Sequence, residues 1–135
     1  MTKNNGLGPA PWILVVDDNP GVRGPVSDFL SIRGGYQVDT AETLAQARAR
    51  LTSGRLYAGV VLDTDLPDGQ GYDLVKATDE GIHLEGYLSA VRPVLIAVSE
   101  FKDNQRLWRG APFLQKGEGL GARVVQTMDD LLGRK

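Results

Sequence analysis

Five short apolar runs divide the chain, with amphipathic stretches between them. They are WILVV (12–16), YQV (36–38), GVVL (59–62), VLIAV (94–98) and PFL (112–114). Runs this continuous are typical of strands that are buried on both faces, because neighbouring side chains then point into two apolar layers. The runs therefore indicate a parallel sheet with a covering layer on each side.

The stretches between the runs have the spacing of amphipathic helices. Apolar residues recur every three or four positions, as on one face of an α-helix, in the segments 22–30, 44–51 and 120–132. Asn19 and Pro20 are typical of a helix N-cap followed by the first helical position. Gly24 and Pro25 interrupt this first helix, so we expect a kink or a delayed start there.

The apolar pattern is clear in the closing helix, 120–132, and unclear in the segment 79–92. In the closing helix, the polar positions that fall off the apolar face are Arg123, Gln126 and Asp129. Between Asp79 and Arg92 no period is clear. Gly81 and Gly86 favour a broken helix or a long loop in this segment.

Strands and helices thus alternate along the chain. Parallel strands joined by helical crossovers are the usual solution for this alternation, with helices on both faces of the sheet. The pattern predicts a three-layer, doubly wound α/β fold around a five-stranded parallel sheet. At 135 residues the chain has the length of one domain. We expect residues 12–133 to form it and residues 1–11 to be a flexible leader.

Composition narrows the functional classes. The chain is 41% hydrophobic and 24% charged, as ordinary globular proteins are. Its net charge is -2 and its pI is about 5.3, so a basic face for binding nucleic acid is not expected. The absence of cysteine excludes disulfides and thiolate chemistry, and suits a reducing cytoplasm. No apolar stretch approaches the ~20 residues of a membrane span, so membrane insertion is not expected.

Polar residues lie at the carboxyl ends of the apolar runs. In chain order they are Asp17 and Asp18, Asp63 and Asp65, Ser99, and Lys116. In a parallel sheet these strand ends share one edge, where open α/β sheets bind their ligands. If the first and third strands are neighbours, as in the flavodoxin-like order 2-1-3-4-5, the carboxylates of Asp17, Asp18 and Asp63 converge.

Three converging carboxylates repel one another, so something must neutralise them. A hard divalent cation such as Mg²⁺ takes oxygen ligands and is commonly shared with phosphate oxygens. Lys116 adds a positive charge and Ser99 adds a hydroxyl, and either group can contact a phosphoryl oxygen. The set favours phosphoryl transfer, with Asp63 as a nucleophile that forms an acyl phosphate.

Four motifs occur in a characteristic order. They are ILVVDDNP (13–20), VVLDTDLPDGQG (60–71), PVLIAVSE (93–100) and GAPFLQKG (110–117). Together they resemble the first strand with its acidic pair, the phosphoacceptor motif, the hydroxyl-bearing fourth strand and the lysine-bearing fifth strand of bacterial response regulator receiver domains. Pro67 and Gly71 lie four and eight residues after Asp63, as in that family. The resemblance covers nearly the whole chain after residue 11.

The resemblance implies a phosphoacceptor that uses a metal ion. Asp63 would accept a phosphoryl group from a histidine kinase or a histidine phosphotransfer protein. Mg²⁺ would be held by Asp17, Asp18, the Asp63 carboxylate and the backbone carbonyl of Asp65. Such a receiver is a signalling module rather than an enzyme, and it catalyses at most its own phosphorylation and dephosphorylation.

The resemblance also implies a conformational switch. Ser99 would bond one phosphoryl oxygen, Lys116 would pair with another, and Phe113 occupies the aromatic switch position, so that phosphorylation changes a protein-binding face. Counted rigidly from Pro93, the hydroxyl position falls on Val98, whereas a strand longer by one residue places Ser99 there.

Departures from the family pattern leave other functions open. Glu100 stands where the family usually has a small residue, and Gly117 replaces a proline that often follows the lysine. Glu100 keeps open a degenerate receiver that binds partners without being phosphorylated. VVLDTD also resembles the motif of haloacid-dehalogenase-type phosphatases, with Asp63 as nucleophile and Asp65 as general acid, although that motif normally follows the first strand.

Overall fold

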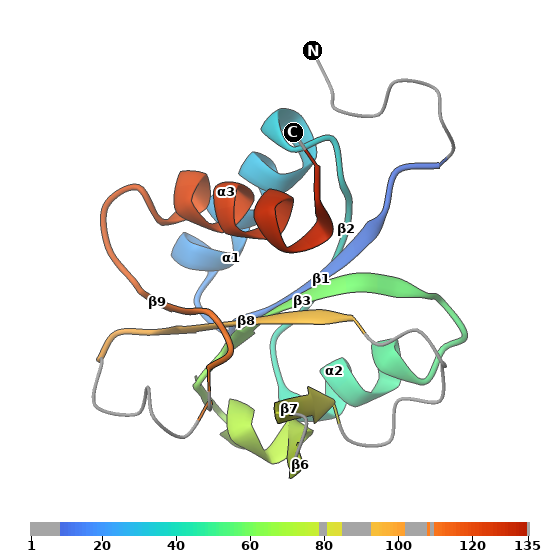
Figure 1. Ribbon diagram of the computed structural model, residues 1–135. Helices are drawn as coiled ribbons and strands as arrows, with labels where there is room; N and C mark the ends of the chain where they lie inside the picture. Colours follow the sequence, from blue (N-terminus) through green and yellow to red (C-terminus); the bar gives the residue numbers. More distant parts are fainter. Residues whose placement is uncertain (1–8, 79–80, 85–92, 102–107, 109, 135) are drawn as a thin grey trace.

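A five-stranded parallel sheet forms the centre of the molecule (Figure 1). The computed structural model describes residues 9–78, 81–84, 93–101, 108 and 110–134. The strands of the sheet are β1 (Trp12–Val16), β2 (Gln37–Ala41), β3 (Tyr57–Asp63), β8 (Val94–Ser99) and β9 (Phe113–Gln115). They lie in the order β2-β1-β3-β8-β9 and every pairing is parallel. The predicted flavodoxin-like fold is therefore confirmed.

Helices cover both faces of this sheet. They are α1 (Pro20–Asp28), α2 (Leu44–Leu51) and α3 (Leu120–Leu132). The first and last lie together on one face, and α2 lies on the other (Figure 1). Ile13 and Val15 of β1 pack in the apolar cluster beneath α1 and α3, whereas Leu14 and Val16 pack in the cluster beneath α2. None of the helices in the described part of the chain is long and apolar enough to cross a membrane.

α1 starts where the sequence predicts. The side chain of Asn19 accepts a hydrogen bond from the Gly21 amide at 2.9 Å and so caps the helix. The helix runs on through Pro25, so the expectation of a delayed start is wrong. A proline removes only one backbone hydrogen bond, and the neighbouring turns keep theirs. After α1 the chain widens into a π-helix, η1 (Phe29–Arg33).

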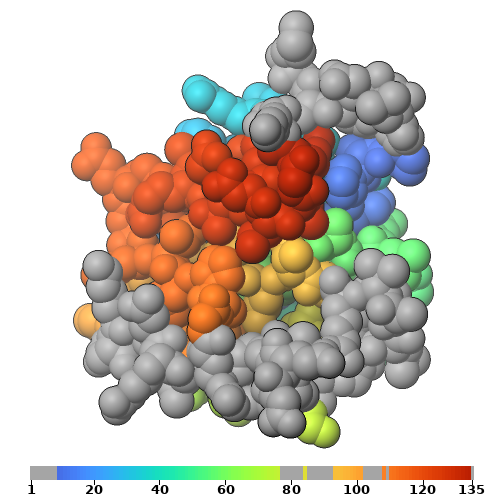
Figure 2. Space-filling model, viewed as in Figure 1, coloured from blue at the N-terminus to red at the C-terminus, as the bar shows by residue number. Residues whose placement is uncertain are grey.

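α3 has the apolar face that the spacing predicts, with one correction. Leu120, Val124 and Met128 are buried, and Figure 2 shows α3 as an outer layer on its side of the molecule. Asp129, expected off the apolar face, is also buried, with only 3% of its surface exposed. Its carboxylate accepts a hydrogen bond from the Tyr36 hydroxyl at 2.6 Å. Burial is tolerated because the polar group has a partner.

The segment after β3 differs most from the expectation. Its elements are β4 (Asp65–Leu66), β5 (Gly69–Gln70), the 3₁₀ turn η2 (Gly71–Leu74), β6 (Val75–Thr78) and β7 (Gly81–Leu84). β4 pairs with β5, and β6 with β7, as two antiparallel hairpins. The broken helix or long loop is thus wrong for residues 81–84, whose backbone groups are satisfied by strand pairing. The rest of that expectation, 79–80 and 85–92, lies outside the described residues.

Candidate functional site

Three carboxylates meet at the carboxyl edge of the sheet. β1 and β3 are neighbours in register, so Asp17, directly after β1, reaches Asp63 at the end of β3. Asp17, Asp18 and Asp63 each place a carboxylate oxygen within 4.8 Å of the other two. Asp17 and Asp63 are 1% and 3% exposed, whereas Asp18 is exposed to solvent. The strand order therefore brings together the acids that the sequence places at strand ends.

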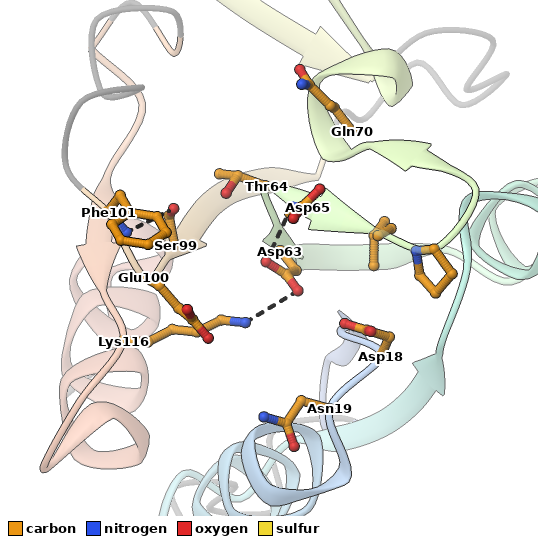
Figure 3. A pocket seen from close by; sticks show the side chains of 12 residues that line it. Asp18, Asn19, Asp63, Thr64, Asp65, Gln70, Ser99, Glu100, Phe101 and Lys116 are labelled. Atoms are coloured by element: carbon orange, nitrogen blue, oxygen red, sulfur yellow. Dashed lines mark hydrogen bonds and ion pairs between the residues drawn. The ribbon is translucent and has the colours of Figure 1, made fainter.

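Lys116 brings a positive charge into the same site. Its backbone amide donates to the Ser99 carbonyl at 2.7 Å, at the end of the β8–β9 pairing. Its ammonium lies 2.9 Å from Asp17 Oδ2, and its side chain is 11% exposed. The same ammonium lies 3.1 Å from Asp63 Oδ2 (Figure 3). One cation is thus shared between two buried carboxylates.

The charge balance of the site shifts two pKa values. Burial raises the pKa of Asp63 to about 6, and the negative charge of Asp17 adds to this effect, while Lys116 opposes it. Burial alone would lower the pKa of the Lys116 ammonium, but its hydrogen bond to Asp17 and the charge of Asp63 raise it overall. The lysine remains charged, and the carboxylates retain an excess of negative charge.

The loop after β3 is held close to the Asp63 carboxylate. The Asp65 amide donates to Asp63 Oδ1 at 3.2 Å, as Figure 3 shows, and the Gly71 amide donates to the Thr64 carbonyl at 3.0 Å. A Cβ atom at Gly71 would collide with the carbonyl oxygen of Asp63. Glycine is therefore required at this position so that the loop can turn back against the strand.

Asp18, Asp63, Asp65 and Lys116 line an open cavity of about 660 Å³. Ser99 is 3% exposed and lines it, whereas Val98 packs in the apolar cluster beneath α1 and α3. β8 continues through Ser99, so of the two candidates it is Ser99 that brings a side chain to the site. Its hydroxyl accepts a hydrogen bond from the Phe101 amide at 3.2 Å. Glu100 and Phe101 line the same cavity (Figure 3).

Two positions that the resemblance singled out lie outside this cavity lining. Phe113 begins β9 and packs, half-buried, against the apolar cluster beneath α2. Gly117 has a φ of 153°, a conformation that favours glycine, and the peptide that joins it to Lys116 is trans.

Two residues of the Asp63 loop could not be identified as functional from the sequence. Thr64 is 7% exposed and lines the cavity next to Asp63, but no sequence signal distinguishes it from a loop residue. Asp68 lies in the same loop, and its carboxylate accepts hydrogen bonds from the amides of Leu44 at 2.8 Å and Ala45 at 3.1 Å. It thereby binds the loop to the start of α2. These bonds lower the pKa of Asp68.

The donor set fits a hard divalent cation. The three clustered carboxylates supply only oxygen ligands, and their combined negative charge exceeds what one lysine neutralises. One of them is exposed to solvent, so an ion bound there would keep water ligands. Oxygen ligands together with retained water are what Mg²⁺ prefers.

One curated protein matches part of this chain. A curated relative, the protein PetR of Rhodobacter capsulatus, is 39% identical over 66 residues, which are 49% of this chain and 27% of PetR. The chain thus matches less than a third of the length of PetR.

Solved structures share the fold. A CheY-like receiver domain from Methylobacillus flagellatus is 23% identical, with a TM-score of 0.68 over 88% of this chain and 98% of that one. The response regulator TrrA from Thermotoga maritima, in complex with Mg²⁺-BeF, is 23% identical, with a TM-score of 0.63 over 87% and 98%. At these identities the likeness shows the fold alone.

The sequence model of the response regulator receiver domain matches residues 13–105, which is more than half of the chain. This match includes the acidic pair after β1, the Asp63 loop and the end of β8. Lys116 lies beyond the matched range, but the fold brings it to the same site. The chain therefore belongs to the response regulator receiver domain family.

Proposed function

We propose that this receiver accepts a phosphoryl group on Asp63 and thereby changes a protein-binding face. The observation that carries the proposal is the buried Asp63 carboxylate, which lies beside a second carboxylate and a lysine in an open cavity. Receiver domains take phosphoryl groups from histidine kinases or phosphotransfer proteins, and they are signalling modules rather than classical enzymes. We assign this role to residues 12–133 acting as one receiver domain in the cytoplasm.

Asp63 acts as the nucleophile in this proposal. One of its oxygens forms a bond to phosphorus while the nitrogen–phosphorus bond of the donor phosphohistidine breaks. The electron pair of the broken bond stays on the imidazole nitrogen, and the product is an aspartyl phosphate. Because burial raises the pKa of Asp63 only to about 6, the carboxylate is mostly ionised and nucleophilic at neutral pH.

Asp17, Asp18 and Asp63, together with the backbone carbonyl of Asp65, would hold the Mg²⁺ ion. When bound, the ion supplies positive charge that offsets the carboxylates and the phosphoryl oxygens. The oxygen-only cluster supports this assignment, as does TrrA, a protein of the same fold that was solved with Mg²⁺-BeF.

Lys116 and Ser99 would contact the transferred phosphoryl group. Lys116 already pairs with Asp63, and it would pair with a phosphoryl oxygen once the carboxylate is esterified. The Ser99 hydroxyl now accepts from the Phe101 amide and would donate to a second phosphoryl oxygen. Phe113 would then repack at the edge of the sheet. The changed surface is the signal to a partner protein.

Intact mass spectrometry tests the proposal. The protein is incubated with Mg²⁺ and acetyl phosphate, and in parallel with a histidine kinase and ATP. We expect a single phosphoryl adduct that is lost at alkaline pH and does not form in Asp63→Asn. Asp130→Asn removes an exposed carboxylate from α3 and is the matched control that should still form the adduct.

One observation favours a second candidate, a degenerate receiver that binds partners without phosphorylation. Glu100 lines the cavity next to Ser99 and adds negative charge where a phosphoryl group would sit. Mg²⁺ binding without any adduct, even from a cognate kinase, would support this candidate. Steady turnover of phosphomonoesters would instead support the phosphatase alternative.

A further inference from the structure

Arg23 ties the acidic loop after β1 to the end of β2. It lies on α1, and its guanidinium Nη1 donates to the backbone carbonyl of Asp17 at 2.9 Å. Its Nη2 pairs with Glu42 Oε1 at 2.9 Å, directly after β2. The Arg23 side chain is 18% exposed, and Arg23 is not among the residues that line the cavity. It can therefore affect the site only through the loop.

The bond to Asp17 fixes the peptide plane from which Asp18 departs. The Asp17 carbonyl and the Asp18 amide belong to one planar peptide, so the direction of the carbonyl constrains the direction of Asp18. The Asp17 carboxylate has contacts of its own, because Oδ1 accepts from the Asn19 amide at 2.9 Å and Oδ2 pairs with Lys116 at 2.9 Å.

Asp18 depends on this peptide more than Asp17 does. It is exposed, and within the described residues no hydrogen bond or ion pair holds its carboxylate. Its carboxylate nevertheless lies in the cluster with Asp17 and Asp63. The backbone of the loop is therefore what places it there.

We propose that Arg23 is a positioning residue for the cation site: it orients the Asp17–Asp18 peptide so that the Asp18 carboxylate stays within reach of the ion. The inference rests on the proposed function, because it concerns the Mg²⁺ ion of that site. Glu42 already offsets the guanidinium charge, so the effect of Arg23 on the cluster is mainly geometric. Residues that orient metal ligands in this way typically change metal affinity ~10- to 100-fold.

Calorimetric titration with MgCl₂ tests the role of Arg23. We expect Arg23→Met to weaken Mg²⁺ binding about tenfold. Arg23→Lys should be intermediate, because an ammonium can reach the Asp17 carbonyl or Glu42 but cannot span both in one plane. Glu42→Gln removes the ion pair, leaves the bond to Asp17, and should bind Mg²⁺ within about twofold of the unmodified protein.

A second measurement separates positioning from a general loss of structure. The rate of phosphorylation by acetyl phosphate is followed as the Mg²⁺ concentration rises. Arg23→Met should need about tenfold more Mg²⁺ for half of its maximal rate, and should approach the normal rate at saturation. Partial unfolding would instead lower the fraction of protein that binds Mg²⁺ without changing the affinity of the remainder. If Arg23→Met does not fold, the Mg²⁺ affinities of Arg23→Lys and Glu42→Gln test the inference in its place.

Three results would overturn the inference. Binding of Mg²⁺ by Arg23→Met, or by Arg23→Lys if that variant decides, within about twofold of the unmodified protein would show that the peptide needs no support. Equal weakening in Glu42→Gln would show that charge, not geometry, matters. An unmodified protein that fails to bind Mg²⁺ would overturn the proposed function as well. Mg²⁺ binding without phosphorylation would contradict only the proposed function, since the affinity comparison would still stand.

Discussion

Two carboxylates of the same sheet, on strands separated by β1, have opposite environments. Asp63, at the carboxyl edge, shares one lysine with a second buried acid. Asp39, on the edge strand β2, pairs with the Arg55 guanidinium at 2.7 Å and accepts a hydrogen bond from the Tyr57 hydroxyl at 2.6 Å. Arg55 is in turn held 3.6 Å above the ring of Trp12.

Their pKa values shift in opposite directions as a result. Burial raises the pKa of Asp63 to about 6, and Asp17 adds to the rise. Burial would also raise the pKa of Asp39, but hydrogen bonds from Tyr57 and Arg55 outweigh it and lower the pKa. The carboxylate cluster of the candidate site is thus electrostatically under-compensated, whereas Asp39 is a satisfied structural acid. A site that keeps excess negative charge can bind a cation. Without the cation, the excess charge lowers the free energy of unfolding.

Removing the shared lysine should have the largest effect. In Lys116→Met, two buried carboxylates lose the ammonium that pairs with both of them, and such losses cost ~3 kcal/mol or more. We expect this decrease in the free energy of unfolding from urea denaturation in EDTA at pH 7.5. Lys76→Met, at an exposed lysine, should change it by less than ~0.5 kcal/mol. A loss no larger than that of Lys76→Met would mean that the site is not under-compensated.

Neutralising Asp63 should stabilise the metal-free protein. The folded pKa is raised from 3.8 to about 6, so the folded state takes up a proton in this range and wild-type stability falls as pH rises through it. Above pH 6 the loss of stability caused by the ionised Asp63 carboxylate reaches its full size. Asp63→Asn should then be more stable by ~3 kcal/mol, because a net shift of about two units, which already includes the attraction of Lys116, corresponds to that free energy. Below pH 4 the difference should vanish. Lower stability of the variant at pH 7.5 would contradict the comparison.

Mg²⁺ should relieve part of the same cost. An ion that binds only the folded state at ten times its dissociation constant stabilises that state by ~1.4 kcal/mol. We expect this increase in urea denaturation once the dissociation constant is known from calorimetry. NaCl at equal ionic strength should not reproduce it, and Asp63→Asn should gain less than the unmodified protein. Equal gains in both proteins would place the ion elsewhere.

The fold could be predicted because its strands are buried on both faces. A continuous apolar run identifies such a strand, and β1 matches its run from Trp12 to Val16. Periodicity fails where a partner lies far away in sequence. The buried carboxylate of Asp129 is hydrogen-bonded to the hydroxyl of Tyr36, which lies 93 residues earlier in the chain. No local pattern contains that information. The β6–β7 hairpin was missed because each of its strands has only four residues, VKAT and GIHL, and so short an alternation is weak evidence for a strand.

The site could be predicted as far as strand ends determine it. Asp17 and Lys116 directly follow strands of one parallel sheet and Asp63 ends another, so topology alone brings them together. The choice between Val98 and Ser99 needed the true length of β8. Arg23 could not be found, since an arginine on a helix is most often a solvated residue and its partners come from two loops.

The smallest effect that we predict concerns the satisfied acid. Tyr57→Phe removes one hydrogen bond to Asp39 and should cost ~1 kcal/mol at pH 7.5. Because the pKa of Asp39 is lowered on folding, its contribution is present above pH 4 and is lost as pH falls through the folded value. The deficit of Tyr57→Phe should therefore shrink in acid. Tyr72→Phe, which keeps its ring against Trp108 and loses a hydroxyl without a partner among the described residues, is the control.

Both Asp63→Asn and Tyr57→Phe should approach the unmodified protein in acid, the first from higher stability and the second from lower. Approach from the same side would mean that the two carboxylates do not differ in the way that their contacts indicate.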